Sequence, residues 1–184
     1  MNRVSKEHKE KILNLINPET HEISWNEEGV PYKFKEKRKI KDGRVSRAWG
    51  AKFELLVRKD LEGKGRIVDK WSNNIDLEIG KLVSAKRKYN PFKKVMTIGT
   101  GFPDFVSIQH AYDNMYSVIG VEVKTNGILS KIEKEKCVWY LNKKIFSQIW
   151  IAKAVRNGRK IEIEYENFEE KYGQKFSKVS SKEQ

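Results

Sequence analysis

The stretch from Val118 to Lys124 alternates between apolar and other side chains, and this alternation constrains the fold more than any other feature of the chain. Successive side chains of a β-strand point to opposite faces, so the isoleucine and two of the valines of this stretch share one face. That face suits a core. The opposite face then carries a carboxylate, Glu122, and an ammonium, Lys124, two residues apart.

A second short apolar run, from Phe102 to Ile108, precedes this strand. Pro103 suits the start or edge of a strand, and Asp104 directly follows it. Residues 110–117 can form a connection between the two strands but are too few for a crossover helix. The sequence therefore predicts an antiparallel pair of strands that brings Asp104 close to Glu122.

Carboxylates and an ammonium in this arrangement suit phosphodiester hydrolysis. That reaction needs charge neutralised on the phosphate, a water deprotonated near neutral pH and a stabilised leaving oxygen. A hard cation such as Mg²⁺ can supply all three, and it binds through one or two carboxylates together with waters and phosphate. Asp104 and Glu122 offer the oxygens, while Lys124 can hold the attacking water or a phosphate oxygen.

The spacing of Pro103-Asp104 and Glu122-Val123-Lys124 resembles the PD-(D/E)xK nuclease superfamily. The wider pattern GFPDF…GVEVK…LS, followed by a helix, is most similar to its archaeal Holliday-junction-resolvase and VRR-NUC branches. The resemblance covers roughly residues 46–168. It implies an α/β fold with a restriction-endonuclease-like core, a mixed central β-sheet flanked by helices. It also implies cleavage that depends on Mg²⁺, for which Mn²⁺ can substitute.

The resemblance also implies a set of site residues. The catalytic residues would be Asp104, Glu122, Lys124 and Glu54, and the metal ligands would be Glu54, Asp104, Glu122 and Val123. In the resembled families a polar residue on the next helix, usually Gln, supports the catalytic lysine. Here the matching position holds Glu133 or Lys136.

Glu54 enters this set because Gly50-x-x-x-Glu54 fits the first-helix glutamate of the resembled resolvases. Two alternatives stay open. Glu54 can instead be an ordinary helix carboxylate that pairs with Arg58 one turn later. Asp76 or Glu78 could then replace it as the third ligand.

The Glu-x-Lys pattern is weak by itself in a chain with 34% charged residues, and it recurs at Glu7, Glu62 and Glu169. Only the copy at Glu122 lies on an alternating strand that follows a Pro-Asp strand. An alternative without a catalytic role stays open. Asp104 can be a turn residue, and Glu122 with Lys124 can form a solvated strand face.

The net charge of +13 is concentrated in two segments. Residues 31–50 carry eight basic and two acidic side chains, and residues 81–103 carry six basic and no acidic ones. Focused positive charge favours a polyanion such as DNA as partner. The expected nucleic-acid-binding residues are Lys37, Arg38, Lys39, Lys41, Arg44, Lys86, Arg87, Lys88, Lys93 and Lys94.

The order of elements indicates a nuclease core with an N-terminal appendage. Residues 1–45 are expected to form a helix and a basic extension, residues 46–170 the core, and residues 171–184 a disordered tail. Asp42-Gly43 predicts a hairpin turn in a basic β-ribbon, with a mobile charged linker as the alternative. Helices are expected over residues 5–16 and 47–62, and a third begins at Ser130 with a capping box to Glu133. Strands are expected over residues 66–71 and 148–155, the second of them joined by a hairpin to a strand over 160–165. Residues 73–74 are expected to form a turn, and residues 99–101 a flexible, glycine-rich segment that leads to the active site.

Composition excludes other classes of protein. The single cysteine, Cys137, rules out a disulfide framework and a cysteine zinc site, and the three histidines are scattered. No apolar run approaches the length of a membrane span and no signal peptide is visible, which predicts a cytoplasmic protein without a membrane partner.

Three functional hypotheses follow. The first is a Mg²⁺-dependent DNA endonuclease, for which the resemblance favours a homodimer and branched or junction DNA. The second is a nucleic-acid-binding module with the nuclease fold and no chemistry; whether an unknown protein partner is needed stays open under any hypothesis. The third is an RNA nuclease, since nothing in the sequence distinguishes the 2′-hydroxyl.

Overall fold

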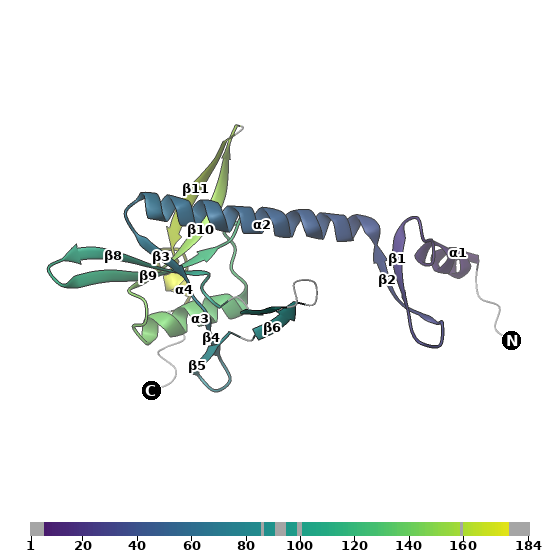
Figure 1. Ribbon diagram of the computed structural model, residues 1–184, viewed down its shortest axis with the longest axis horizontal. Coiled ribbons are helices and arrows are strands. Elements are labelled where there is room, and N and C mark those ends of the chain that lie inside the picture. Colours follow the sequence, from purple (N-terminus) through teal and green to yellow (C-terminus); the bar gives the residue numbers. More distant parts are fainter. Residues whose placement is uncertain (1–5, 86, 91–94, 99–100, 159, 177–184) are drawn as a thin grey trace. The chain divides into compact units, whose positions relative to one another are not determined.

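The computed structural model describes residues 6–85, 87–90, 95–98, 101–158 and 160–176. The chain divides into an N-terminal unit, Met1–Ala51, and a C-terminal unit, Lys52–Gln184 (Figure 1). The predicted boundary lies between residues 45 and 46, whereas the structure divides the chain a few residues later, within a helix. The elements are α1 (Lys6–Leu15), β1 (His21–Trp25), β2 (Pro31–Glu36), α2 (Lys37–Gly63), β3 (Ile67–Lys70), β4 (Asn73–Asp76), β5 (Lys81–Ser84), β6 (Arg87–Asn90), β7 (Val95–Ile98), β8 (Phe105–Tyr112), β9 (Met115–Val123), α3 (Lys131–Asn142), β10 (Gln148–Asn157), β11 (Lys160–Asn167) and α4 (Phe168–Phe176).

A five-stranded mixed sheet forms the centre of the C-terminal unit, in the order β11-β10-β9-β8-β3. β9 and β10 are parallel, and the other neighbours are antiparallel. Parallel neighbours need a crossover, and α3 provides it. The expected mixed α/β sheet is therefore confirmed, as is the antiparallel pairing of the two strands that carry Asp104 and Glu122.

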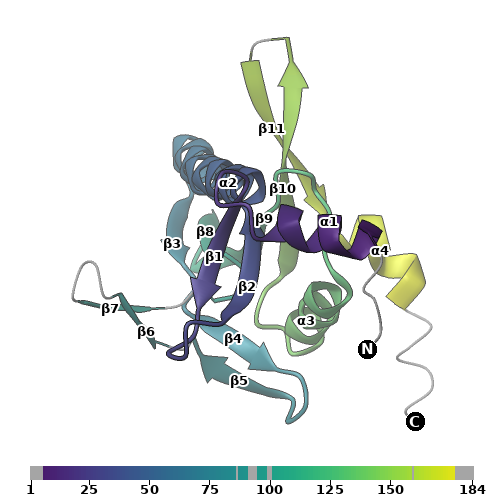
Figure 2. The ribbon, with the colours of Figure 1, turned by 90° about the vertical axis from the view of Figure 1, so that its right-hand side faces the viewer.

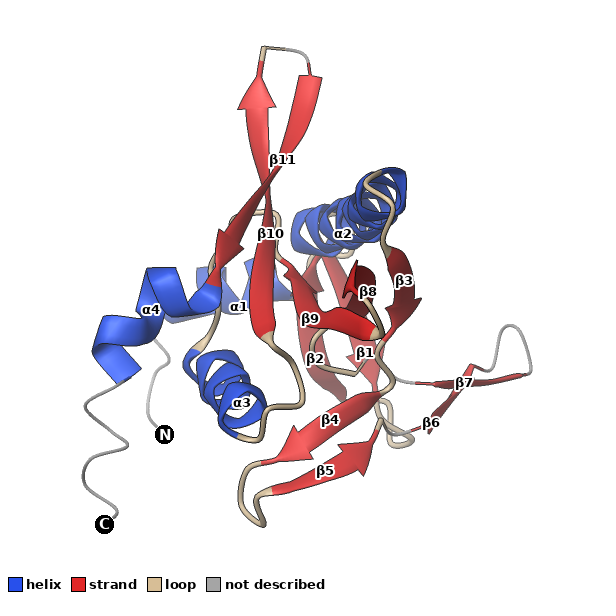
Figure 3. Ribbon diagram, turned by 90° about the vertical axis from the view of Figure 1, so that its left-hand side faces the viewer, coloured by secondary structure: helices blue, strands red, loops and turns tan. Residues whose placement is uncertain are grey.

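Helices cover both faces of this sheet. On one side the C-terminal half of α2 buries Phe53, Val57 and Leu61, which recur at helical spacing. On the other side α3 buries Cys137 and Tyr140 in the main hydrophobic cluster. Figure 3 shows α3 and this part of α2 on opposite sides of β9 and β10. Because the sheet is covered twice, both faces of its central strands are buried.

The N-terminal unit is a β-hairpin between helices. β1 and β2 pair antiparallel, and α1 lies beside them (Figure 2). Its apolar residues are poorly covered: among the residues up to Ala51 whose side-chain exposure is described, none is a buried hydrophobic residue. Trp25 and Tyr32 are both more than half exposed.

The prediction of a basic β-ribbon around Asp42-Gly43 is wrong. The helix predicted to begin at residue 47 begins ten residues earlier, at Lys37, and includes this segment. The preceding hairpin is β1–β2 instead. Asp-Gly predicts a turn only where strands flank it, and here the flanks are lysines and arginines, which are good helix formers. An Arg38–Asp42 ion pair one helical turn apart stabilises the helix further.

Other local predictions also need correction. Asn73-Asn74 lies in β4 and not in a turn. Residues 171–176 of the expected tail belong to α4, whose Phe168 is buried against the core; residues 177–184 lie outside the described part. Ile132, in the first turn of α3, is 58% exposed and does not face the core. None of the described helices is long and apolar enough to span a membrane.

Gly101 and Phe102, which directly precede Asp104, are tightly held. A Cβ on Gly101 would lie 2.1 Å from the carbonyl oxygen of Trp71, so only glycine fits there. The backbone N–H of the buried Phe102 donates to the carbonyl of Asn73 at 2.9 Å. Residues 99 and 100 of the predicted approach lie outside the described residues.

Candidate active site

Asp104 and Glu122 meet where β8 begins and β9 ends. Phe105 is opposite Val121 in the ladder, which places the residue before Phe105 beside the residue after Val121. The backbone N–H of Asp104 donates to Glu122 Oε2 at 3.2 Å, and the backbone N–H of Val123 donates to Asp104 Oδ2 at 2.9 Å. The two carboxylates are thus fixed by the backbone of the opposite strand.

Close packing beneath Asp104 fixes its backbone as well. A Cβ on Gly120 would lie 2.8 Å from Pro103 Cγ and 3.1 Å from Phe146 Cδ2, so the missing side chain of Gly120 makes room for Pro103. On the other side, the backbone N–H of Trp71 donates to the carbonyl of Asp104 at 3.2 Å. Asp104 is therefore part of a rigid strand start and not of a free turn.

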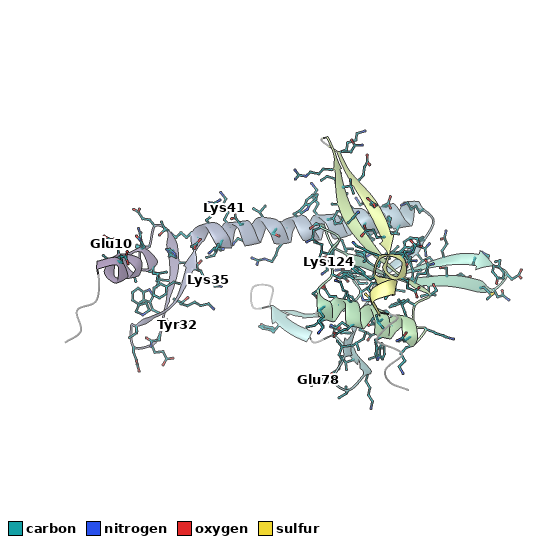
Figure 4. All side chains as sticks on the ribbon, turned by 180° about the vertical axis from the view of Figure 1, so that it is seen from behind. Glu10, Tyr32, Lys35, Lys41, Glu78 and Lys124 are labelled. Atoms are coloured by element: carbon teal, nitrogen blue, oxygen red, sulfur yellow. The ribbon has the colours of Figure 1, made fainter. Side chains whose placement is uncertain are left out.

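Lys124 lies between two carboxylates. Its Nζ is 3.0 Å from Glu122 Oε1 and 2.7 Å from Glu133 Oε1. Glu133 is held by the first turn of α3, where it forms a capping box with Ser130. Figure 4 shows Lys124 within the packed body of the C-terminal unit. The interpretation of Glu122 and Lys124 as a solvated strand face is wrong, because Glu122 is only 4% exposed.

Of the predicted supports for Lys124, the structure brings Glu133 to it and not Lys136. The Nζ of Lys136 instead donates to Asn74 Oδ1 at 2.8 Å. Glu133, which caps the start of α3, therefore also supplies the carboxylate that faces Lys124.

Glu54 lies on α2 near the same site. Its Oε2 is 3.4 Å from Nζ of Lys70, and its charge contributes to the electrostatics of Asp104. Asp76 has another role: its Oδ1 accepts from the backbone N–H groups of Glu78 and Ile79 in the β4–β5 turn. Arg58 pairs with Glu62 at 2.8 Å and not with Glu54. Of the three candidates for a third carboxylate, Glu54 is the one whose charge acts on Asp104.

Burial dominates the titration of the two central carboxyls. It raises the pKa of Asp104 to about 6, and the charge of Glu54 adds to that rise against the hydrogen bond from Val123. Burial and then the charge of Asp104 raise the pKa of Glu122 to about 8, although Lys124 opposes the shift. The site thus contains more buried acid than its own cations compensate.

Hydrogen bonding decides the charge of Lys124. Burial would lower the pKa of its ammonium, but the carboxylates of Glu133 and Glu122 outweigh burial and raise the pKa above its ordinary value. Burial would likewise raise the pKa of Glu133, whereas its bonds to Lys124 and Ser130 lower it. Lys124 is therefore an ammonium at neutral pH, a donor and point charge and not a base.

The donor set suits a hard divalent cation. Asp104 and Glu122 present carboxylate oxygens at one point, next to the backbone of Val123, and their mutual repulsion would be relieved by added positive charge. Within the described ranges, no three or more Asp, Glu, His or Cys side chains stand gathered around one point as a ready metal site. Binding would therefore use Asp104 and Glu122 first, because Glu54 is engaged by Lys70.

The predicted nucleic-acid-binding residues fall into two groups. Those of the first segment are exposed on the first turns of α2, where Lys39 pairs with Glu36 at 2.8 Å; they are Lys37, Arg38, Lys39, Lys41 and Arg44. Figure 4 shows Lys35 on the neighbouring strand and Lys41 on the helix. In the second segment Arg87 and Lys88 lie on β6, and Lys86, Lys93 and Lys94 lie outside the described residues.

One site residue was missed from the sequence. Lys70 is opposite Phe105 in the ladder, its ammonium pairs with Glu54, and its charge lowers the pKa of Asp104. The signal available was modest: Val68 and Lys70 alternate on a short strand, so a buried residue and a lysine share one face. The pairing of β3 with β8, which brings Lys70 to the site, is non-local and was not predicted.

Comparison with models of protein families, with curated proteins and with solved structures finds no match to this chain. Its function is therefore inferred from the site.

Proposed function

We propose that this chain is a divalent-metal-dependent endonuclease that hydrolyses phosphodiester bonds in DNA, with Mg²⁺ as its metal. The observation that carries the proposal is the convergence of Asp104, Glu122 and Lys124 at adjoining strand ends. Two buried carboxylates beside a fixed ammonium supply what phosphodiester hydrolysis needs, namely a seat for a hard cation and a positive charge for the phosphate.

Each residue has a distinct part in this proposal. A bound Mg²⁺ would neutralise phosphate charge and lower the pKa of a water. Asp104 and Glu122 would hold it, with Glu54 and Val123 completing the set. Lys124 donates to a phosphate oxygen or to the attacking water, since its ammonium stays protonated. Glu133 holds Lys124 beside Glu122.

The substrate follows from charge and from the resemblance. The cations of residues 31–50 and 81–103 would contact backbone phosphates, which give affinity without sequence specificity. The likeness to Holliday-junction resolvases supports branched DNA as substrate, and it supports a homodimer that cuts both strands. Cleavage of RNA is the outcome that the following experiment separates from cleavage of DNA.

A single cleavage panel tests the proposal. Linear duplex DNA, single-stranded DNA, a flap, a four-way junction and an RNA duplex are each incubated with Mg²⁺, Mn²⁺ or EDTA. Lys124→Ala is run beside Lys131→Ala, a matched lysine on the exposed start of α3 whose side chain is 90% exposed. We expect metal-dependent cutting of branched DNA that Lys124→Ala loses and Lys131→Ala keeps. Tight, salt-sensitive binding with no cutting under any metal would refute the enzyme and favour a binding module.

A further inference from the structure

A cavity in the N-terminal unit lies outside the candidate active site. It has a volume of about 390 Å³ and is lined by the end of α1, by β1 and β2, and by the first turns of α2 (Figure 2). Pockets for small ligands span about 300–1,000 Å³, so this cavity is large enough for one nucleotide. We call it the hairpin pocket.

Part of the lining of the hairpin pocket is apolar. Leu15, Phe34 and Ile40 contribute to it, one side chain each from α1, β2 and α2. Phe34 is opposite Ile23 in the β1–β2 ladder, so the hairpin fixes the position of its backbone. Phe34 and Ile40 are half-buried. An aromatic ring that the protein covers only in part can stack on a flat ligand.

Cations form another part of the lining. Lys35, Lys39 and Arg47 line the same cavity together with one carboxylate, Glu36. The Nζ of Lys39 is 2.8 Å from Glu36 Oε1, which compensates one positive charge. Within the described part of the chain, Lys35 and Arg47 pair with no carboxylate. The pocket therefore has positive charge available beside its apolar lining.

Gly43 keeps the α2 side of the hairpin pocket open. It lines the cavity, and the nearest contact of a Cβ placed there would be Arg47 Nη1, at 3.8 Å. Positions 39, 43 and 47 are four residues apart, so they share one face of the helix. Glycine is unfavourable inside a helix, and no close contact requires it here. What this glycine provides is the space that a larger side chain would fill.

We propose that the hairpin pocket binds one nucleotide of a single-stranded nucleic acid, with the base against Phe34 and the phosphate beside Lys35 and Arg47. Cations alone attract any nucleic acid, paired or unpaired. The aromatic ring and the concave shape favour a single strand, because an unpaired base can leave its stack and enter a pocket. In a duplex the faces of the bases are covered by their neighbours.

The rest of the hairpin supports this ligand. Trp25 is 57% exposed and Tyr32 is 65% exposed, so the hairpin offers further aromatic surface. Figure 4 shows Tyr32 and Lys35 on this part of the chain. Residues 31–50 carry eight basic and two acidic side chains. Positive charge combined with exposed aromatic rings is typical of proteins that hold single strands.

The inference rests on the proposed function for the nature of the ligand, because a nuclease must hold nucleic acid. It adds a property that phosphate contacts do not supply. Phosphate contacts bind paired and unpaired strands alike, whereas the hairpin pocket distinguishes an unpaired nucleotide from a paired one.

Fluorescence anisotropy in EDTA tests the pocket, because EDTA prevents metal-dependent cleavage and leaves only binding. The probes are a short labelled oligothymidine, the matching oligouridine and a duplex DNA of the same length. Gly43→Leu fills the pocket without removing a charge, and Ala48→Leu places the same side chain at an exposed position of the same helix. We expect Gly43→Leu to weaken binding of the single strands at least about 10-fold and to leave duplex binding unchanged. Ala48→Leu should change neither.

Two further measurements do not depend on how Gly43→Leu folds. Phe34→Leu removes the ring but keeps an apolar side chain, and it should cause the same selective loss. Photocrosslinking of the natural chain to an oligothymidine that contains 5-bromodeoxyuridine should label a peptide that includes Phe34. Single-strand binding that both variants retain, equal losses for single strand and duplex, or crosslinks confined to residues after Ala51 would overturn the proposal.

The fate of the nuclease is separate from that of the pocket. A chain that binds single strands through the pocket and cleaves nothing with any metal refutes only the nuclease. A chain that cuts DNA with Mg²⁺, while Gly43→Leu and Phe34→Leu bind single strands as the natural chain does, refutes only the pocket. Tighter binding of oligothymidine than of oligouridine assigns the pocket to DNA, and the reverse order assigns it to RNA.

Discussion

Glu133 connects the start of α3 to Lys124. Its Oε1 accepts a hydrogen bond from Lys124 Nζ at 2.7 Å, while its Oε2 accepts one from the backbone N–H of Ser130, also at 2.7 Å. A capping box normally only satisfies the first N–H groups of a helix. Here the same carboxylate also holds the ammonium that faces Glu122, so the cap of α3 positions Lys124.

Glu133→Gln should therefore slow cleavage without unfolding the protein. Glutamine still completes a capping box, but it withdraws the negative charge that holds Lys124. We expect the rate to fall about 10–100-fold, as for other residues that orient a catalytic group, with the metal requirement unchanged. Glu135→Gln is the matched control, because Glu135 lies on the same helix and pairs only loosely, at 3.9 Å, with the exposed Lys131. Equal rates for the two variants would show that Glu133 is only a cap.

Asp104→Asn should abolish metal-dependent cleavage while DNA binding persists. The amide keeps the size of the side chain but loses the charge that a hard cation requires, so we expect a loss of at least about 100-fold. Asp76→Asn is the control, since an amide can still accept from the backbone of the β4–β5 turn. Cleavage and duplex binding are measured on both variants. If Asp76→Asn were the inactive one, the third-ligand assignment to Glu54 would fail.

Gly120→Ala should destabilise the protein and impair the site together. The added methyl would lie 2.8 Å from Pro103 Cγ, so Pro103 and the adjoining Asp104 must shift. Overpacking of this kind costs about 1–3 kcal/mol of unfolding free energy. Gly50→Ala is the opposite control: a methyl added there would meet nothing within 4 Å, and alanine stabilises a helix by up to about 1 kcal/mol over glycine. Urea unfolding measures the expected loss of stability in Gly120→Ala and the expected gain in Gly50→Ala, and cleavage rates show whether the site is impaired.

The structure explains which parts of the site could be predicted from the sequence. The alternation around Glu122 fixes which residues share a face, and the short link to Asp104 leaves little choice but an antiparallel pair. These signals are local. The expected core face of β9 is confirmed by Ile119 and Val121, which are buried.

One error is local, and the others arise where distant segments decide the outcome. Asp42-Gly43 has the composition of a turn, but the helix of α2 continues through it. Lys70 could not be assigned to the site, because its place depends on the pairing of β3 with β8 across more than thirty residues. The burial of the β9 face that carries Glu122 was also not predicted. α3 covers that face, and the alternation of one strand cannot show that a helix packs on its polar side as well.

The basic start of α2 should govern affinity for DNA and not the rate of cutting. Lys41→Gln/Arg44→Gln removes two exposed charges from the N-terminal unit. If both contact phosphates, the slope of log affinity against log salt should fall by about 1.8, at about 0.9 for each contact. Lys143→Gln/Lys160→Gln removes the same charge from exposed positions of the C-terminal unit. Equal slopes for the two variants would remove α2 from the interface.

Tyr165 should contribute stability that depends on pH through Asp60. Its hydroxyl donates to Asp60 Oδ2 at 2.7 Å, and Lys64 Nζ lies 2.7 Å from the same oxygen. Burial would raise the pKa of the Asp60 carboxyl, but these two bonds outweigh burial and hold that pKa below its ordinary value. A carboxyl with a lowered pKa in the folded state stabilises the fold above its unfolded-state pKa, and this contribution is lost as the pH falls through the folded value.

Tyr165→Phe should therefore lower the unfolding free energy by about 1.5–3 kcal/mol at neutral pH, the usual contribution of a hydrogen bond to a charged group. The difference from the natural chain should begin to shrink below about pH 4, where Asp60 becomes protonated in the unfolded state, and should be lost once the pH falls through the lowered pKa of the folded state. Urea unfolding at neutral and acidic pH measures it, with Tyr32→Phe, a largely exposed tyrosine, as the control. A difference that stays constant with pH would mean that Tyr165 stabilises the fold by packing against Trp150 and not through the Asp60 carboxylate.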